Sequence, residues 1–220
     1  MITRLIRLAA VAGLLLAGFA CAQDPPKRGE VASSEPRTQA ARLMNELMSG
    51  KTPIGMPFTL TDQHGKKTRL ADFRGKLVLL YFGYTTCPDV CPTDLAAMAQ
   101  AIELLGSQGA QVQPVFITLD PARDTRELLR DYARAFHPRF AALSGSEAEI
   151  RRIATAYKVY YEKSTPPNSK VYLIEHTAFT FLLDRDGKYR MFFPPGTPPQ
   201  RMVTQLREHM HTAAAPAGPQ

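Results

Sequence analysis

The sequence predicts an α/β fold around a mixed sheet of thioredoxin type, and two observations support that prediction. The apolar runs 77–84 (LVLLYFGY) and 112–120 (VQPVFITLD) have the pattern of strands buried on both faces. Each run is followed by a segment with helical periodicity, which gives the strand and helix alternation of an α/β sandwich. A chain of 220 residues, 45% of them apolar, has enough material for one domain with a sizeable core.

The other elements follow from local patterns. Alternating apolar residues on either side of His64-Gly65 indicate an added β-hairpin, and Asp186-Gly187 marks a second one. Ser146 stands where it would cap a helix. In chain order the sequence predicts a hairpin over 58–70, a strand over 77–84, a helix over 93–105, a strand over 112–120, helices over 125–136 and 146–157, a hairpin over 177–193 and a helix over 198–210.

The first 22 residues have the pattern of an export signal or membrane anchor. Arg4 and Arg7 precede an uncharged apolar run that ends at Ala20, too short for an ordinary membrane span. Cleavage after Ala22 would remove Cys21, whereas lipoprotein processing before Cys21 would make it a lipidated anchor. We therefore expect an exported, periplasmic protein that is attached to the inner membrane by an N-terminal anchor or lipid.

Residues 23–52 are polar and contain several prolines, which predicts a flexible linker with one helical segment over 39–48. Met44 and Met48 lie at helical spacing there, and we interpret them as a packing stripe. The domain proper is expected over 53–212, and residues 213–220 have the composition of a disordered tail.

The charge of the chain argues against one class of function. Its formal net charge is +7, and it is +5 without Arg4 and Arg7. A long Lys/Arg run and interleaved aromatic residues are both absent from the sequence, so we expect no nucleic-acid partner. We expect a monomer.

The stretch TTCPDVCP places Cys87 and Cys91 between a buried strand and the start of a helix. Pro88 and Pro92 favour an extended backbone at the two cysteines and suit the first turn of the following helix. Free backbone N–H groups and the helix dipole at this position favour thiolate over thiol. Asp89, between the cysteines, is interpreted as a turn former and capping residue.

Three roles for this pair are compared. A structural disulfide across so short a loop would gain little chain entropy. Redox chemistry stays open, although three residues separate Cys87 from Cys91 where the thioredoxin motif has two. A metal site is compatible with sulfur atoms roughly 4 Å apart, and soft thiolates select Cu(I), whereas Zn(II) normally requires four ligands.

A third ligand from elsewhere would indicate copper, and His176 is the best candidate. It is expected to begin an apolar strand after the polar loop KSTPPNSK, beside a mobile segment. The alternatives are weaker because His64 lies in a turn, His137 follows a helix, and His209 and His211 lie near the end of the chain.

Four stretches together resemble one family: YFGYTTCPDVCPTDL, ITLDPARDT, FHPRFAALSGS and YLIEHTAFTFLLDRDGKY. Their order and spacing over about residues 53–210 are similar to those of the Sco/SenC family. The resemblance implies a thioredoxin fold with insertions that binds Cu(I) or Cu(II) through Cys87, Cys91 and His176. Thr86 and Glu175 depart from the commonest family pattern but remove no ligand.

The resemblance also implies a function and partners. It implies a copper chaperone that serves the copper-bearing subunit of cytochrome c oxidase during assembly, together with a thiol reductant protein and a possible second copper chaperone. The alternative is a periplasmic thiol-disulfide oxidoreductase or redox sensor that acts through Cys87 and Cys91. Asp120 is expected to hold loop geometry near the site, and Arg123 and Asp124 to form a surface pair.

Overall fold

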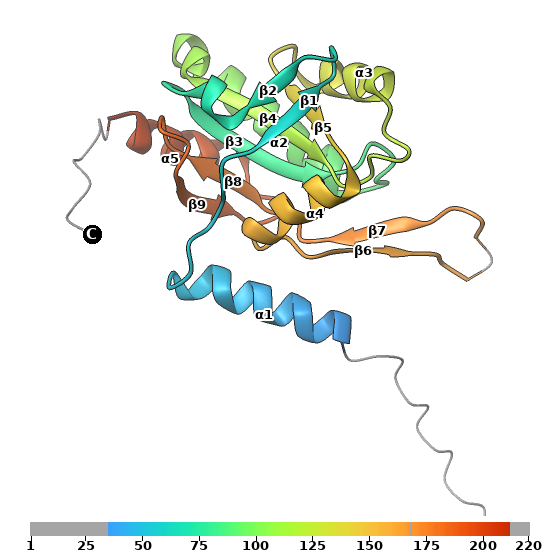
Figure 1. The fold of residues 1–220 in the computed structure, drawn as a ribbon. Helices are drawn as coiled ribbons and strands as arrows, with labels where there is room; N and C mark the ends of the chain where they lie inside the picture. Colours follow the sequence, from blue (N-terminus) through green and yellow to red (C-terminus); the bar gives the residue numbers. More distant parts are fainter. Residues whose placement is uncertain (1–34, 168, 212–220) are drawn as a thin grey trace, which may run out of the picture. The chain divides into compact units, whose positions relative to one another are not determined.

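A mixed sheet of seven strands is the centre of the fold in the computed structural model, which describes residues 35–167 and 169–211 (Figure 1). The predicted signal or anchor segment, the first part of the predicted linker and the predicted tail lie outside these residues. The strand order is β2-β1-β5-β4-β3-β8-β9. The strands are β1 Thr59–Asp62, β2 Lys67–Arg69, β3 Leu77–Gly83, β4 Val112–Thr118, β5 Ala141–Ser144, β8 Thr180–Leu183 and β9 Tyr189–Phe193.

The two apolar runs form β3 and β4 at the middle of this sheet, as predicted. Every residue of β3 is buried. The two strands are parallel and in register from the Leu77–Val112 pair to the Gly83–Thr118 pair. Their carboxyl ends therefore lie at the same edge of the sheet, the edge where ligands bind in open α/β folds.

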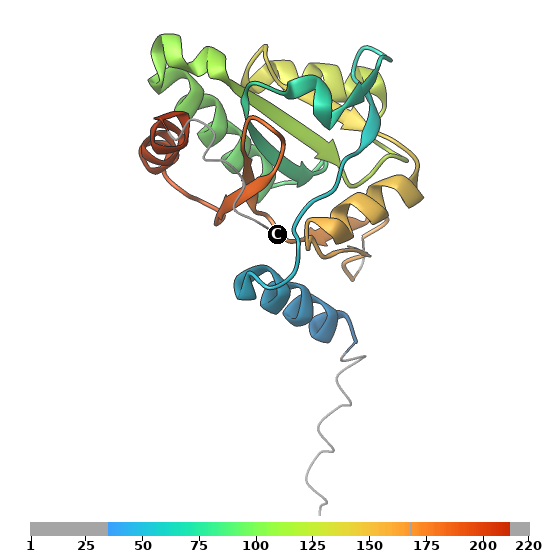
Figure 2. The same ribbon diagram turned by 60° about the vertical axis from the view of Figure 1, so that its left-hand side comes forward.

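The helices cover both faces of the sheet. Figure 2 shows α2 (green) beside α5 (red), and aromatic packing of Phe116 on Tyr132 places α3 on the same face. On the opposite face, Tyr157 at the end of α4 packs against Phe82. The bounds are α2 Val90–Leu104, α3 Arg126–Phe136, α4 Glu147–Ala156 and α5 Pro199–His211, with 3₁₀ turns at Leu70–Phe73 and Gly106–Gln111.

Several local predictions are confirmed. The two predicted hairpins form β1–β2 and β8–β9, and Gly65 and Gly187 in their turns have φ of 85° and 81°. At such angles glycine is favoured because it lacks a Cβ. Ser146 caps α4 in a capping box: its hydroxyl accepts from the Glu149 amide, and the Glu149 carboxylate accepts from the Ser146 amide at 2.8 Å.

The prediction missed three strands. β5 was not recognised, although it pairs parallel to β4. The other two, β6 Tyr161–Ser164 and β7 Leu173–His176, form an antiparallel hairpin that is a separate two-stranded sheet (Figure 1). These strands are short, and β6 has a mostly polar, partly exposed sequence, so none of them has the apolar alternation by which strands are recognised.

The helix predicted over 39–48 is longer and packs through different residues. It is α1, Glu35–Ser49. Leu43 and Leu47 are buried, whereas Met44 and Met48 are 37% and 66% exposed, so the interpretation of the methionines as a packing stripe was wrong. Among the described residues, no helix is both long and apolar enough to cross a membrane.

Candidate metal centre

The structure brings together the donor atoms of Cys87, Cys91 and His176. The two Sγ atoms and a ring nitrogen of the histidine all lie within 4.8 Å of one another. Cys91 Sγ is 3.3 Å from His176 Nε2. This is the one group of three or more Cys, His, Asp or Glu side chains within the described ranges that has metal-binding spacing. Its members come from the loop after β3, from α2 and from β7.

The cysteines are held by the transition from β3 to α2. The Cys87 amide donates to the carbonyl of Tyr84 at 3.2 Å in a tight turn after the strand. Cys91 lies in the first turn of α2 rather than in the loop, because the helix already begins at Val90. Asp89 occupies the N-cap position, but its side chain makes no capping hydrogen bond, so the predicted capping role was wrong.

Gly83 makes room for the sulfur of Cys91, a role that was not predicted from the sequence. A Cβ atom at this position would lie 2.8 Å from Cys91 Sγ and 3.0 Å from the ring of Tyr81. The absent side chain therefore lets the start of α2 approach the end of β3. A glycine closing a fully apolar strand just before the cysteines was the available signal.

The two thiols have opposite protonation preferences. The pKa of Cys87 is lowered to about 3, chiefly by a hydrogen bond from Cys91 and further by His176 and the backbone amides of residues 89 and 91. Hydrogen bonding to Cys87 and burial raise the pKa of Cys91. The prediction that the helix start favours thiolate therefore holds for Cys87 and fails for Cys91. The pair shares one proton, with Cys87 as the thiolate.

Burial disfavours negative charge on two polar side chains near Cys91. Asp94 is buried, its pKa is raised by that burial, and its Oδ1 accepts from the amide of Gly196 at 2.9 Å. Burial also raises the pKa of Tyr81, whose hydroxyl has no hydrogen-bond partner in the described part of the chain. Both shifts have the same main cause, because desolvation disfavours the charged form of each side chain.

His176 lies between two tyrosine rings at the end of β7. Its ring meets those of Tyr81 and Tyr84 edge-on, with centroids 6.2 Å and 6.1 Å away. The residue pairs with Tyr161 across the β6–β7 hairpin. The expectation that His176 begins a strand beside a mobile segment was wrong, because it is the last residue of a strand.

The remaining histidines of the described ranges lie elsewhere. His64 is exposed in the β1–β2 turn, and His137 pairs with Glu103 at 3.0 Å. His209 bonds the carbonyl of Gln205 through Nδ1 at 2.9 Å, and His211 is the exposed last residue of α5. None of them joins a group of metal donors.

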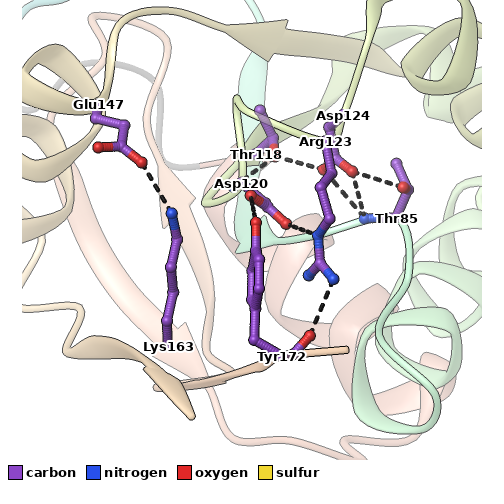
Figure 3. A network of polar contacts seen from close by, with 8 residues as sticks. All are labelled: Thr85, Thr118, Asp120, Arg123, Asp124, Glu147, Lys163 and Tyr172. Atoms are coloured by element: carbon purple, nitrogen blue, oxygen red, sulfur yellow. Dashed lines mark hydrogen bonds and ion pairs between the residues drawn. The ribbon is translucent and has the colours of Figure 1, made fainter. Parts of the chain in front are cut away.

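Two acidic side chains in the loop after β4 connect the segments around the site through hydrogen bonds and an ion pair (Figure 3). Asp124 is buried and accepts hydrogen bonds from the hydroxyls of Thr85 and Thr118 and from the Thr85 amide. Asp120, fully buried, pairs with Arg123. The predicted surface pair of Arg123 and Asp124 was therefore wrong, whereas the structural role expected of Asp120 agrees with its contacts.

The arrangement suits a soft metal ion. Two sulfur donors and one imidazole nitrogen converge, neither cysteine is in a disulfide, and the lowered pKa of Cys87 favours its thiolate. Thiolate and imidazole donors in this number match Cu(I), and the imidazole extends the set to Cu(II). The same thiols are also suitable for exchange with a disulfide.

Comparison with known proteins places these residues in a family. The family described as SCO1/SenC matches residues 46–211. An SCO2-like protein of Rickettsia prowazekii is 40% identical over 161 residues, covering 73% of this chain and 78% of the relative.

Two solved structures share both sequence and fold. Bradyrhizobium japonicum ScoI with copper bound has 39% identity and a TM-score of 0.65, covering 71% of this chain and 99% of that protein. Yeast Sco1 with copper bound has 34% identity and a TM-score of 0.67, covering 74% of this chain and 92% of that protein. The family match over residues 46–211 spans the sheet, the cysteine pair and His176, and we conclude that the chain belongs to the SCO1/SenC family.

Proposed function

We propose that this protein binds one copper ion through Cys87, Cys91 and His176 and delivers it to the copper-bearing subunit of cytochrome c oxidase during assembly of that enzyme. The observation that carries the proposal is the convergence of the three donor atoms within 4.8 Å. Two relatives of the same fold are described with copper bound, which supports copper as the ion. The oxidase as acceptor is proposed from the family resemblance.

Delivery requires that the ion can leave, and the three ligands differ in this respect. Cys91 is buried and Cys87 is half-buried, and both belong to the β3–α2 segment, whereas His176 belongs to a separate hairpin. We propose that His176 leaves first and that an acceptor thiolate or histidine takes its place. Both thiolates hold Cu(I) throughout, whereas Cu(II) depends more on the imidazole.

The test is a copper titration of the full, reduced chain with a competing chelator, under anaerobic conditions for Cu(I). His176→Ala is expected to weaken Cu(II) binding about 100-fold and Cu(I) binding about tenfold, because removing one ligand leaves two thiolates. His64→Ala is the control, since His64 is exposed in a turn away from the site and should bind like the wild type. Equal losses for both ions would contradict the proposed division of roles.

A second function is favoured by one observation, the unequal acidity of the two thiols. A low-pKa thiolate paired with a buried, protonated thiol suits a thiol-disulfide oxidoreductase, in which Cys87 attacks and Cys91 resolves the mixed disulfide. Such an enzyme does not require His176. Reduction of a model disulfide that survives His176→Ala but not Cys91→Ala, together with weak copper binding by the wild type, would favour this function over copper delivery.

A further inference from the structure

The hairpin that carries His176 is fastened to the body of the protein a short distance from the histidine. We call β6, β7 and Tyr172 the hairpin arm. Its strands bond to each other rather than to the central sheet, and the backbone pairing runs from Tyr161–His176 to Ser164–Leu173. Because the arm is a separate sheet, its strands do not pair with the central sheet, and contacts of its side chains with the body contribute to where His176 lies relative to the cysteines.

One polar attachment of the arm is at Tyr172, four residues before His176 (Figure 3). Arg123 Nη1 donates to the carbonyl of Tyr172 at 2.9 Å, and the guanidinium carbon lies 3.7 Å from the centre of the tyrosine ring. The hydroxyl of Tyr172 donates to Asp120 Oδ1 at 2.8 Å. Two neighbouring side chains thus hold the backbone, the ring and the hydroxyl of one arm residue.

Asp120 also fixes the direction of Arg123. Its second carboxylate oxygen accepts from Arg123 Nε, and its side chain is fully buried. A charged hydrogen bond in such a site is stronger than one in water and leaves the guanidinium a single orientation. The planar fork of arginine can bond Asp120 and the Tyr172 carbonyl at once, which a lysine ammonium cannot do with the same geometry.

The loop that supplies these residues also holds the cysteine segment. Asp124, next to Arg123 in the chain, accepts from the amide and hydroxyl of Thr85, two residues before Cys87. One short loop after β4 therefore contacts both ligand-bearing segments through adjacent side chains. The arm has other attachments as well: the side chain of Ile174 is buried in the hydrophobic core, and Lys163 forms a more exposed ion pair with Glu147 at 2.9 Å.

We propose that Arg123, oriented by Asp120, is a positioning residue: it latches Tyr172 and so holds the hairpin arm where His176 completes the copper site. The proposal rests on the proposed function. The latch acts through His176 and touches neither the cysteines nor the ion. Breaking it therefore reduces the contribution of His176 to binding and leaves that of the two thiolates.

The first test needs no metal. Hydrogen exchange of the reduced full chain is compared for wild type, Arg123→Met and Arg130→Met, the last being a matched loss of one exposed arginine on α3. Arg123→Met is expected to speed exchange of the β7 amides about tenfold, and Arg130→Met to leave it unchanged, because local opening follows local contacts. Unchanged β7 exchange in Arg123→Met would overturn the latch.

The second test asks whether the latch acts through His176. Arg123→Met should weaken Cu(II) binding about tenfold, as outer-shell substitutions do, and shift the Cu(II) absorption and EPR spectra toward those of His176→Ala. In the His176→Ala background the same substitution should have no further effect. An equal loss in both backgrounds would overturn the proposal, because Arg123 would then act on the fold or on the cysteines.

Tyr172→Phe is a milder variant that tests the latch even if Arg123→Met misfolds. It removes only the hydroxyl that bonds Asp120. It should shift the same spectra in the same direction, with a loss of about two- to threefold. Arg123→Lys should fall between wild type and Arg123→Met. If Cu(II) binding by the wild type did not depend on His176, both the proposed function and the role of the latch in copper binding would be overturned. The hydrogen-exchange result would still show whether Arg123 holds the arm.

Discussion

Cys87 and Cys91 show how four residues of separation produce two different thiols. Cys91 is buried in the first turn of α2 and donates its proton toward Cys87, which is half-buried and faces the amides at the helix start. Burial disfavours the charged form of Cys91, and the hydrogen bond from Cys91 stabilises the charged form of Cys87. One proton per pair is therefore the ground state around neutral pH, and metal binding must release that proton.

The acidity of Cys87 has a direct consequence for its reactivity. An ordinary thiol with a pKa near 8.5 loses about tenfold in alkylation rate for each pH unit below that value. Because the pKa of Cys87 is lowered to about 3, its thiolate dominates at every pH above that value. The iodoacetamide rate of Cys87, measured by mass spectrometry of the cysteine peptide, should change little between pH 5 and pH 8.

The control for this rate is Cys91→Ala, which removes the largest cause of the lowered pKa. In this variant the alkylation rate of Cys87 should regain a rise with pH in the same range. If the alkylation rate of wild-type Cys87 already rose tenfold per pH unit, Cys87 would be an ordinary thiol. That result would count against the proposed oxidoreductase function more than against copper delivery.

Among the secondary-structure elements, β3 and its neighbours in the sheet were predicted correctly, because an unbroken apolar run indicates a strand that is buried on both faces. The β6–β7 hairpin was missed because its strands are only four residues long and because β6 is mostly polar and partly exposed, while Ile174 alone of β7 is buried in the core. The missed hairpin carries His176. The location of the third ligand was consequently described wrongly even though the residue was named.

Helix α1 provides a test at the same scale. It packs through Leu43 and Leu47, and Glu46 forms an ion pair with Lys158. Leu47→Ala removes a buried side chain at a typical cost of about 2–5 kcal/mol, concentrated on this helix. Exchange of the α1 amides should therefore accelerate by at least about tenfold, with copper affinity unchanged.

Met48→Ala is the matched control for that experiment, because Met48 neighbours Leu47 in the chain but is 66% exposed. Exchange in this variant should match the wild type. Similar acceleration in both variants would show that Leu47 does not anchor α1.

At the scale of the whole molecule, the candidate site joins parts of the chain that lie far apart in sequence. Cys91 and His176 are 85 residues apart, yet their donor atoms are 3.3 Å apart. An ion bound by both closes a long loop and binds the folded state selectively. At a free concentration of about 100 times Kd, such a ligand stabilises the fold by about 2.7 kcal/mol.

This coupling predicts a thermal shift. For a domain of this size 1 kcal/mol corresponds to about 2–4 °C, so saturating Cu(I) should raise Tm of the reduced chain by about 5–10 °C in calorimetry or fluorescence melting. The shift should be smaller for His176→Ala. Protein with a Cys87–Cys91 disulfide should show none, because its sulfurs cannot act as two thiolates; a similar shift in that oxidised form would place copper elsewhere.

The α/β class, the two central strands, the helices after them and the three candidate donors could all be predicted from the sequence alone. These features depend on local periodicity, on proline and glycine positions and on motif spacing, which are properties of residues close together in the chain. The unequal protonation of the thiols, the space left by Gly83 and the attachment of the His176 hairpin through Arg123 became visible only in the folded structure. Each of these depends on burial or on contacts between segments distant in the chain, and such contacts form only when the whole sheet has assembled.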